Sequence, residues 1–241
     1  MTTTILKKAI RSAVILAAIA PLASYAAAYT PAKFGNAETI LSKQVTLPAS
    51  FGESVKTVAV YCQADIMSTG NINNVDCYEN SPLVSMQNVT ESALKSATFE
   101  PATIDGKAVP VRMQMRVVYS LGGTQAPIVL LPNLGTLQAQ YGTHYYAPQE
   151  RLDTNDWYAN YSTKEHGSGK LFFAEGKTTR VMANVEADGK VETVSTIEAA
   201  MRKKADAESI ESSLKKSRFI PGFVENKPTA MHYIAVVNYQ Q

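Results

Sequence analysis

One stretch of the chain occurs twice, and this repeat constrains the fold more than any other feature. The first copy covers residues 97–107 and runs on to Tyr119, and the second covers 217–227 and runs on to Tyr239. A shift of 120 positions aligns Phe99 with Phe219, Pro101 with Pro221, Lys107 with Lys227 and Tyr119 with Tyr239. Because this shift is far longer than one helix or strand, we expect one folding unit to be present twice.

Each copy begins with a pattern that predicts a β-hairpin. Apolar and polar residues alternate over 57–66 and over 181–185, with the period of two that is typical of a half-buried strand. The first run turns near Gly70 and returns over 72–78, and the second turns at Asp188-Gly189 and returns over 191–197. Glycine and Asp-Gly between alternating runs are strong hairpin signals.

A helix and a third strand follow the hairpin in each copy. The helices, around 90–97 and over 206–216, must end before the proline of Phe-x-Pro, because the residue before a proline is pushed out of the α region. The third strands cover 111–119 and 231–239. The sequence therefore predicts an α+β fold with two domains. Each is a β-β-α-β antiparallel sheet with a helix on one face, the strand order 2-1-3 and strand three at the edge. The other face of the first edge strand is expected to be polar and unobstructed at Arg112, Gln114 and Arg116.

The two cysteines are placed symmetrically about the first hairpin turn. Cys62 and Cys77 are therefore predicted to form a cross-strand disulfide, and closing this loop would stabilise the fold by about 3 kcal/mol in the chain-entropy model. A redox pair is the alternative, which the absence of a C-x-x-C spacing disfavours. In the hairpin region the two copies match at a shift of 119, so the corresponding positions in the second copy hold Val181 and Thr196, an ordinary cross-strand pair.

Residues 1–28 have the form of a secretory signal peptide. A basic front end precedes an uncharged apolar run over 13–23, and the alanines at 26–28 offer a cleavage site before Tyr29. The basic residues are Lys7, Lys8 and Arg11. The alternative is a retained membrane anchor, since spanning needs about 20 apolar residues and 12–29 comes close. Cleavage predicts export to the periplasm, where disulfides persist, with no stable membrane span in the mature chain.

Cleavage also changes the charge balance of the chain. It removes three of the 23 Lys and Arg residues and none of the 21 Asp and Glu residues. The mature chain then has 20 basic against 21 acidic residues, a formal net charge of −1 instead of +2. Because this leaves no basic footprint, we expect no nucleic-acid partner.

The repeat divides the chain into a signal peptide 1–28, a first domain 29–120, a connecting segment 121–176 and a second domain 177–241. The connecting segment is rich in aromatic residues and poor in charge, which argues against a disordered linker. We expect it to pack on one or both domains and part of it to build the start of the second. Its aromatic residues are a candidate surface for a sugar or a peptide, although packing is the commoner role: Tyr145, Tyr146, Trp157 and Tyr158.

The order of these elements resembles a known family. A hairpin with a glycine turn, a short helix, Phe-x-Pro, a Gly-Lys or Asn-Lys turn and a closing strand are similar to the C-terminal domain of the TonB energy-transducer proteins, over about 57–119 and 179–239. The resemblance implies that a peptide of an outer-membrane receptor joins the sheet edge as an extra strand. The matching partner-binding edge strands contain Val111, Met113, Met115, Val117 and Tyr119, and Met231, Tyr233, Ala235, Val237 and Tyr239.

The chain departs from that family at its N-terminal end. Transducers keep a membrane anchor with a serine and a histidine four residues apart, followed by a long proline-rich spacer. This chain has Ser12 but Leu16 at that spacing, and no such spacer. Because a protein released from the inner membrane has no route to the proton-motive force, we expect the binding fold without energy transduction.

No catalytic or metal-binding constellation stands out. The three histidines, His144, His166 and His232, lack ligand-like neighbours at metal spacing. The glycine-rich residues 167–170 do not fit a Walker loop, because Lys164 and Leu171 stand where it needs Gly and Ser or Thr. Ser-x-x-Lys occurs at 92–95 and 212–215 without its companion motifs. We therefore expect no enzyme, no metal and no cofactor.

The expected function is a non-catalytic interaction module of the periplasm that binds an envelope protein or peptide by β-strand addition. One alternative is a TonB-type energy-transduction component retained at the inner membrane. Another is a small-ligand binder that uses the aromatic connecting segment. Because edge strands also invite self-pairing, a homodimer through the third strand is the alternative assembly.

Overall fold

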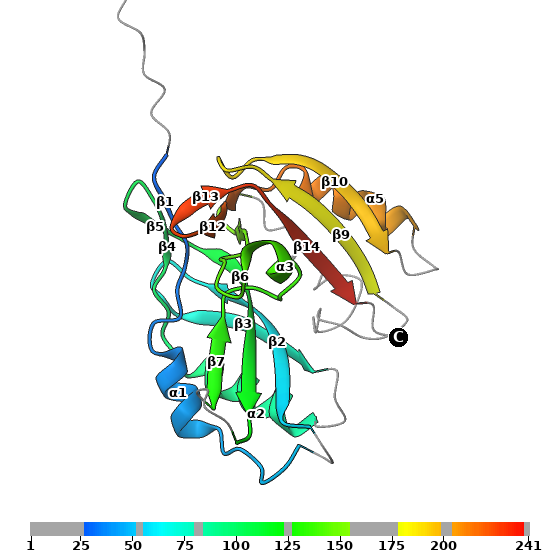
Figure 1. Cartoon of the computed structure of the whole chain (residues 1–241). Coiled ribbons are helices and arrows are strands. Elements are labelled where there is room, and N and C mark those ends of the chain that lie inside the picture. The colour runs from blue at the N-terminus through cyan, green and yellow to red at the C-terminus, as the bar shows by residue number, and fades with distance from the viewer. Residues whose placement is uncertain are drawn as a thin grey trace, which may run out of the picture.

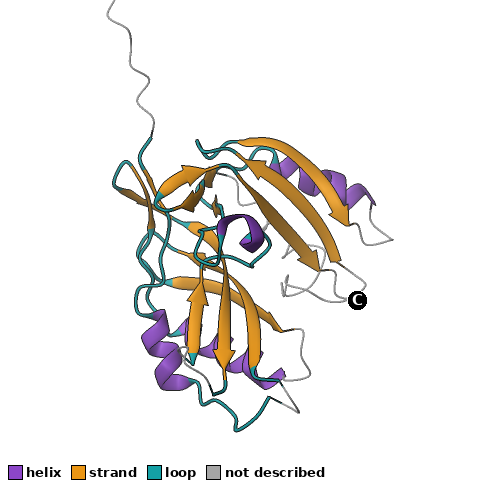
Figure 2. Ribbon diagram, in the orientation of Figure 1, coloured by secondary structure: helices purple, strands orange, loops and turns teal. Residues whose placement is uncertain are grey.

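The computed structural model describes residues 27–51, 55–79, 84–122, 127–154, 178–198 and 204–238. Two main antiparallel sheets each carry helices on one face (Figures 1 and 2), which confirms the predicted α+β class. Among the described residues no helix has both the length and the apolar character to cross a membrane. Most of the predicted signal peptide, residues 1–26, lies outside the described ranges.

The first main sheet contains the three expected strands in the expected order. Strand β2 (Thr57–Ile66) pairs with β3 (Ile72–Glu79) on one side and with β6 (Val111–Ser120) on the other. Helix α2 (Val84–Lys95) packs on one face of this sheet, beside α1 (Ala37–Gln44). The order β3-β2-β6 is the predicted order 2-1-3.

The second main sheet repeats this arrangement in the same register. It consists of β10 (Val191–Glu198), β9 (Thr178–Val185) and β14 (Met231–Asn238) in that order, with α5 (Lys204–Leu214) on one face. Cys62 lies opposite Met115 in the first sheet, and their repeat equivalents Val181 and Ala235 lie opposite each other in the second. The duplication in the sequence is therefore also present in the strand pairing.

Both hairpins turn at a glycine that the Phe-x-Pro motif contacts. Gly70 (φ +83°) and Gly189 (φ +75°) have left-handed backbone conformations, which favour glycine. The N–H of Phe99 donates a 2.9 Å hydrogen bond to the carbonyl of Gly70, and that of Phe219 donates one of 2.9 Å to Gly189. A Cβ atom at either glycine would lie within 2.3 Å of the carbonyl oxygen of that phenylalanine. The motif thus fixes the chain after each helix to the hairpin turn.

A short hairpin follows each Phe-x-Pro motif. Strand β4 (Ala102–Ile104) pairs with β5 (Lys107–Val109), and β12 (Gly222–Val224) pairs with β13 (Lys227–Thr229). Both turn residues have positive φ in each copy: Asp105 +50° and Gly106 +76°, Glu225 +49° and Asn226 +63°. Positive φ at both central residues is the signature of a type I′ hairpin turn.

An extended segment precedes each copy and lies beside its Phe-x-Pro region. In the first copy β1 (Tyr29–Thr30) pairs with β4, and Lys33 pairs with Glu100. In the second copy β8 (Gln149–Arg151) pairs with β11 (Phe219–Ile220). Part of the connecting segment therefore pairs with the second copy.

The connecting segment also packs on the first copy. Strands β7 (Ile128–Leu131) and β8 both pair with β6. The short helix α3 (Gln138–Tyr141) lies between the two main sheets (Figure 1). Residues 155–177, which include Trp157, Tyr158 and His166, lie outside the described ranges.

Alternating side chains form a core between each sheet and its helices. In the first copy this core extends from β2 and β6 to α1, α2 and β7. In the second copy it contains Val181, Ala183, Val185, Val191, Ile210, Leu214, Phe219, Tyr233 and Ala235. The ring of Phe219 packs edge-on against Tyr233 with centroids 4.9 Å apart. Because fully burying one large apolar side chain stabilises by about 1.5–3 kcal/mol, these contacts hold each helix on its sheet.

The predicted disulfide is confirmed. Cys62 and Cys77 lie opposite each other in β2 and β3, and their sulfur atoms are 2.07 Å apart. Val181 and Thr196 occupy the corresponding positions of the second hairpin as an ordinary cross-strand pair. The covalent link is therefore a feature of the first copy alone.

Candidate functional site

The third strand of the first copy is not an edge strand. Strand β7 pairs antiparallel with residues 116–119 of β6, and β8 pairs with Val111 and Arg112. The prediction of a free edge over 111–119 is therefore wrong, because two strands of the same chain cover its outer side. The site residues predicted there are fully buried in the first core: Val111, Met113, Met115, Val117 and Tyr119.

Strand β7 is held by side chains as well as by its backbone. Ile128 lies opposite Tyr119 and Leu130 lies opposite Val117, and both aliphatic side chains belong to the first core. Next to this pairing, the N–H of Ser120 donates a 2.9 Å hydrogen bond to the carbonyl of Pro127. Strand β7 thus completes both the hydrogen-bond ladder and the core at this side of the sheet.

The third strand of the second copy has different surroundings. Strand β14 pairs with β9 over its whole length without a register shift, and no described strand lies on its other side. Met231, Tyr233 and Ala235 are buried. Val237 lies opposite Thr179 in the ladder, and Tyr239 lies outside the described residues. Because the described site residues are buried, a partner would meet the backbone of this strand.

Alternate backbone groups of β14 point away from β9. In an antiparallel pair each residue directs its N–H and C=O to the same side, and successive residues alternate. At the end of β6 the N–H of Ser120 points toward β7, and the N–H of Leu121 donates to Lys56 on the opposite side. The N–H and C=O groups of the even-numbered residues of β6 therefore point away from β2, toward its outer side. The shift of 120 assigns the outward positions of β14 to His232, Ile234, Val236 and Asn238.

One outward group of β14 is already engaged by the first copy. The Nε2 atom of Gln114 donates a 2.8 Å hydrogen bond to the carbonyl oxygen of Ile234. The repeat aligns these two residues, so the two third strands approach each other at equivalent positions. Gln114 is only 4% exposed, and the half-buried Arg116 donates a 2.8 Å hydrogen bond to Gln138 of α3. The prediction of an unobstructed polar face is therefore wrong.

The other outer strands carry features that discourage pairing. Strand β10 has two register irregularities and the acidic residues Glu192 and Glu198. Strand β3 carries Asp76, and its Asn74 has a φ of +48°. Strand β14 has no charged residue, no proline and no irregularity. Since charges, prolines and bulges are the usual protections of an edge, β14 is the least protected of these three strands within the described ranges.

Arg112 lies at the centre of a buried polar network between the two copies. Its Nε atom donates a 3.0 Å hydrogen bond to Oδ1 of Asp65, and its Nη1 atom lies 3.4 Å from Oε2 of Glu150. The Oε1 atom of Glu150 accepts a 2.8 Å hydrogen bond from Ser217 Oγ of the second copy. Arg112 is 2% exposed, so its side chain is not on an open face either. Because breaking such a network leaves a buried charge uncompensated, the network fixes the two copies relative to each other.

The described aromatic residues of the connecting segment do not form the predicted surface. Tyr145 is 2% exposed, and its hydroxyl oxygen accepts a 3.1 Å hydrogen bond from the N–H of Leu137. Tyr146 is half-buried, and its backbone pairs with Phe223. Burial raises the pKa of Tyr146, and the nearby charge of Glu100 raises this pKa further. Tyr145 therefore belongs to the interior, and Tyr146 joins the two copies.

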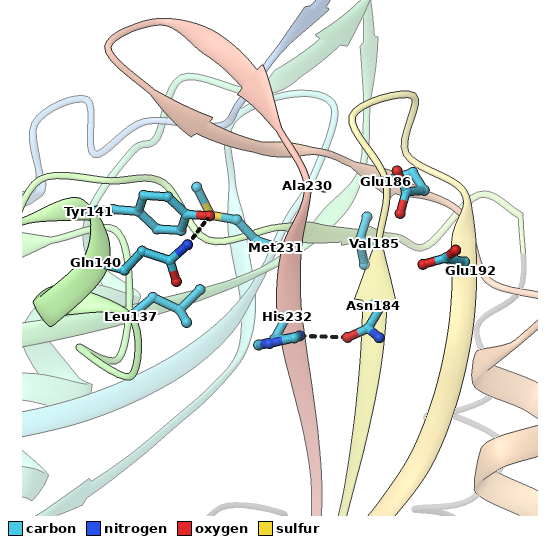
Figure 3. Close-up of a pocket in the computed structure, with 10 residues that line it drawn as sticks. All are labelled: Leu137, Gln140, Tyr141, Asn184, Val185, Glu186, Glu192, Ala230, Met231 and His232. Atoms are coloured by element: carbon cyan, nitrogen blue, oxygen red, sulfur yellow. Dashed lines mark hydrogen bonds between the residues drawn. The ribbon is translucent and has the colours of Figure 1, made fainter.

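A pocket of about 260 Å³ lies between α3 and the second sheet, beside the first residues of β14 (Figure 3). In it Gln140 Nε2 donates a 2.9 Å hydrogen bond to the hydroxyl of Tyr141, and the Nδ1–H of His232 donates one of 2.5 Å to Asn184 Oδ1. The volume is below the range of about 300–1,000 Å³ that is typical of small-molecule sites. Because the partner of His232 is an amide, the described residues that line the pocket show no hydrogen-bonded pair of nucleophile and base.

The other groups considered from sequence lie on the surface. His144 is exposed in the loop after α3. Ser92 and Lys95 are exposed on α2, and Ser212 and Lys215 are exposed at the end of α5. Both Ser-x-x-Lys matches are therefore helix surface, and residues 167–170 lie outside the described ranges. Across the described part of the chain, no group of three His, Cys, Asp or Glu residues could hold a metal ion.

Comparison with known proteins finds no relative. No family model, no curated protein and no solved structure matches the chain. The similarity to TonB C-terminal domains therefore rests on the order of elements and on short motifs, and it stays a prediction.

Sequence reasoning missed β7 and the contact between Gln114 and Ile234. Strand β7 does have a signal, because 128–131 is an apolar run bounded by Pro127 and Pro132, which is typical of a short buried strand. The contact of Gln114 has no comparable signal. It depends on how the two copies are placed relative to each other, which a period-two pattern does not reveal.

Proposed function

We propose that this chain is a non-catalytic interaction protein of the bacterial periplasm. Its second copy binds an extended segment of an envelope protein by β-strand addition to the outer side of β14. One observation carries the proposal: β6, the equivalent strand of the first copy, accepts β7 on its outer side within the same chain. Strand β14 keeps the same register with its inner neighbour, and the described residues place no strand on its outer side.

The main chain supplies the affinity in this mode of binding. The outward positions His232, Ile234 and Val236 offer N–H and C=O groups, and each hydrogen bond to a partner contributes about 1 kcal/mol net. The absence of charge and proline in β14 leaves this ladder open to a second strand. At Ile234 a main-chain amide of the partner would replace the side-chain amide of Gln114, which exchanges one hydrogen bond for another.

Two features of the chain support a location in the periplasm. Residues 1–28 have the pattern of a cleavable export signal, and the disulfide between Cys62 and Cys77 suits an oxidising compartment. Sequencing the N-terminus of the protein recovered from cells tests this part. A chain that begins near Tyr29 supports export and excludes an anchored transducer, whereas a chain that keeps residues 1–28 contradicts it.

Capture of partners from periplasmic and outer-membrane extract tests binding by β14. The mature chain is immobilised as wild type, as Ile234→Pro and as Ile234→Ala. Proline removes the outward N–H, which is the donor that a partner strand would use, whereas alanine keeps it. We expect the wild type and Ile234→Ala to recover the same component, and Ile234→Pro to lose it. Equal recovery by all three proteins would contradict the proposal, and circular dichroism melting of each variant separates lost binding from lost folding.

A second copy of the chain is the alternative occupant of the same edge. Sedimentation of the wild type and Ile234→Pro over a range of concentrations distinguishes self-pairing from binding of an envelope protein. A monomer in both cases agrees with a partner of another kind. If only the wild type forms a dimer, the occupant of this edge is a second copy of the chain and not the proposed partner.

A further inference from the structure

We infer that the partner segment runs antiparallel to β14 and carries branched aliphatic side chains at alternate positions, on the face covered by α5. This inference rests on the proposed function and adds the direction and the chemistry of the partner. It is drawn from β7, which occupies the equivalent outer side of β6.

The direction follows from the pairing of β6 and β7. Leu131 lies opposite Arg116 and Ile128 lies opposite Tyr119, so the two strands are antiparallel. Strands β6 and β14 hold the same register with their inner neighbours, which places their outward N–H and C=O groups at equivalent positions. A strand that satisfies these groups as β7 does must run in the same direction as β7. The main sheets of the molecule also contain antiparallel pairs only, within the described ranges.

The side-chain chemistry follows from the two environments along β7. Ile128 and Leu130 are buried in the first core. Val129 and Leu131 lie on the other face of the sheet, where Val129 is half-buried and Leu131 is buried outside that core. Ile128 and Leu130 extend the first core beyond β6, which explains why both positions are aliphatic. A polar side chain at such a position would be buried without a hydrogen-bond partner, which is unfavourable.

The second core has a similar border along β14. Tyr233 and Ala235 of β14 belong to the core that Ile210 and Leu214 of α5 cover. Ala235 stands where the first copy has Met115, so β14 contributes less side-chain bulk of its own at this point. A neighbouring strand would place every second side chain beside this core. Because burying one aliphatic side chain contributes more than one net main-chain hydrogen bond, these positions determine selectivity.

The sequence of β7 supplies the probe. A peptide with the sequence of residues 127–132, extended by two lysines and labelled with fluorescein, is titrated with the mature chain, and its anisotropy is followed. One variant peptide carries threonine at both core-facing positions, Ile128→Thr and Leu130→Thr, and its matched control carries Val129→Thr. We expect the double variant to lose about tenfold or more in affinity and the control to stay within about threefold. The parent peptide should also lose affinity for the Ile234→Pro chain.

The direction is read from paramagnetic broadening. A nitroxide is attached to one end of the peptide or to the other, and amide signals of β14 are recorded in the labelled chain. In the register of β7, Leu131 of the peptide would lie opposite Val236. Antiparallel binding therefore predicts that a label at the peptide's C-terminal end broadens the signals of 234 and 235 most, and that a label at the N-terminal end broadens those of 237 and 238 most.

The outcomes separate this inference from the proposed function. Parallel placement, or equal losses from the two variant peptides, overturns the inference and leaves strand addition to β14 standing. The same holds if a peptide of alternating threonine and glutamine binds β14 and the β7 peptide does not. Spectral changes confined to 116–119 would mean exchange with β7 itself and also overturn the inference. If neither peptides nor extract components depend on 231–238, the proposed function fails with it.

Discussion

The side-chain amide of Gln114 donates a 2.8 Å hydrogen bond to the carbonyl of Ile234, the residue that the repeat places at the equivalent position. A primary amide carries a donor and an acceptor like those of a peptide group. Gln149 shows the full version of this mimicry, because it donates to the carbonyl of Ala32 at 3.1 Å and accepts from its N–H at 2.8 Å. Gln114 thus occupies, on β14, the place that a main-chain amide of a partner would take.

Replacing Gln114 by leucine should strengthen binding at β14. Leucine has a similar volume but removes the competing hydrogen bond, so a partner strand no longer has to displace it. The expected gain in affinity is about fivefold, equivalent to about 1 kcal/mol for one net hydrogen bond. Anisotropy with the labelled peptide of residues 127–132 measures the gain. Unchanged or weaker binding by both Gln114→Leu and Gln114→Ala would show that Gln114 does not compete for this edge.

Gly189 and Gly106 allow the contact with the Phe-x-Pro motif to be tested. Their φ angles are +75° and +76°, but a Cβ at Gly189 would meet the carbonyl oxygen of Phe219 at 2.1 Å, whereas one at Gly106 would meet nothing within 4 Å. Gly106→Ala should therefore lower the free energy of unfolding by about 1–2 kcal/mol, the cost of the left-handed conformation. Gly189→Ala should lower it by about 3 kcal/mol or more, as for other clashes in a packed interior. Urea unfolding measures both, and equal losses would argue against a structural role for the contact.

The predictions that succeeded concern what a strand's own sequence determines. Period-two alternation identifies the two faces of a strand, so the hairpins, the 2-1-3 order and the pairing of Cys62 with Cys77 were accessible. Alternation does not identify what lies beside a strand. The coverage of β6 by β7 therefore went unrecognised, although the apolar run over 128–131 is a signal for a strand.

Removing the buried cation of the polar network should destabilise the fold strongly. Arg112→Met leaves Asp65 and Glu150 buried without their positive partner, and the expected loss is about 3–5 kcal/mol in the free energy of unfolding. The same substitution should be less harmful in a chain that also carries Asp65→Asn and Glu150→Gln, because the uncompensated charges are then absent. Denaturant unfolding of the four proteins gives the comparison. An equal loss in the two backgrounds would mean that Arg112 acts through packing alone.

The polar network also explains why the prediction of an unobstructed polar face on β6 was wrong. Arg112 and Gln114 alternate with buried apolar residues, which is the usual pattern of a strand with one solvent-exposed face. In this molecule the second copy covers that face, so the polar side chains meet Glu150 and the backbone of Ile234 instead of water. Burial of a strand's polar face is a property of the arrangement of the two copies, and sequence alternation carries no information about it.

The raised pKa of Tyr146 predicts that the fold loses stability at high pH. Burial, followed by the charge of Glu100, raises the pKa of this phenol above its ordinary value of 10.0. In the unfolded chain the phenol ionises at that ordinary value, whereas in the folded chain it stays neutral. Its contribution to stability is therefore complete below pH 10 and is lost as the pH rises toward the folded pKa. Tyr146→Phe should remove this part of the dependence between about pH 9 and 11. Identical slopes of the free energy of unfolding against pH would contradict the assignment.

Amide hydrogen exchange along β14, read by NMR in the mature chain, tests the central claim most directly. The outward amides of His232, Ile234 and Val236 should exchange about 100-fold faster than those of Tyr233 and Ala235, since the described part of the chain gives them no ladder partner. Adding the peptide of residues 127–132 should slow the outward amide of Val236, which the register of β7 on β6 places opposite Leu131 of the peptide, and leave those of Tyr233 and Ala235 unchanged. Equal protection of all five amides in the chain alone would mean that this side of β14 is already covered, and would contradict strand addition.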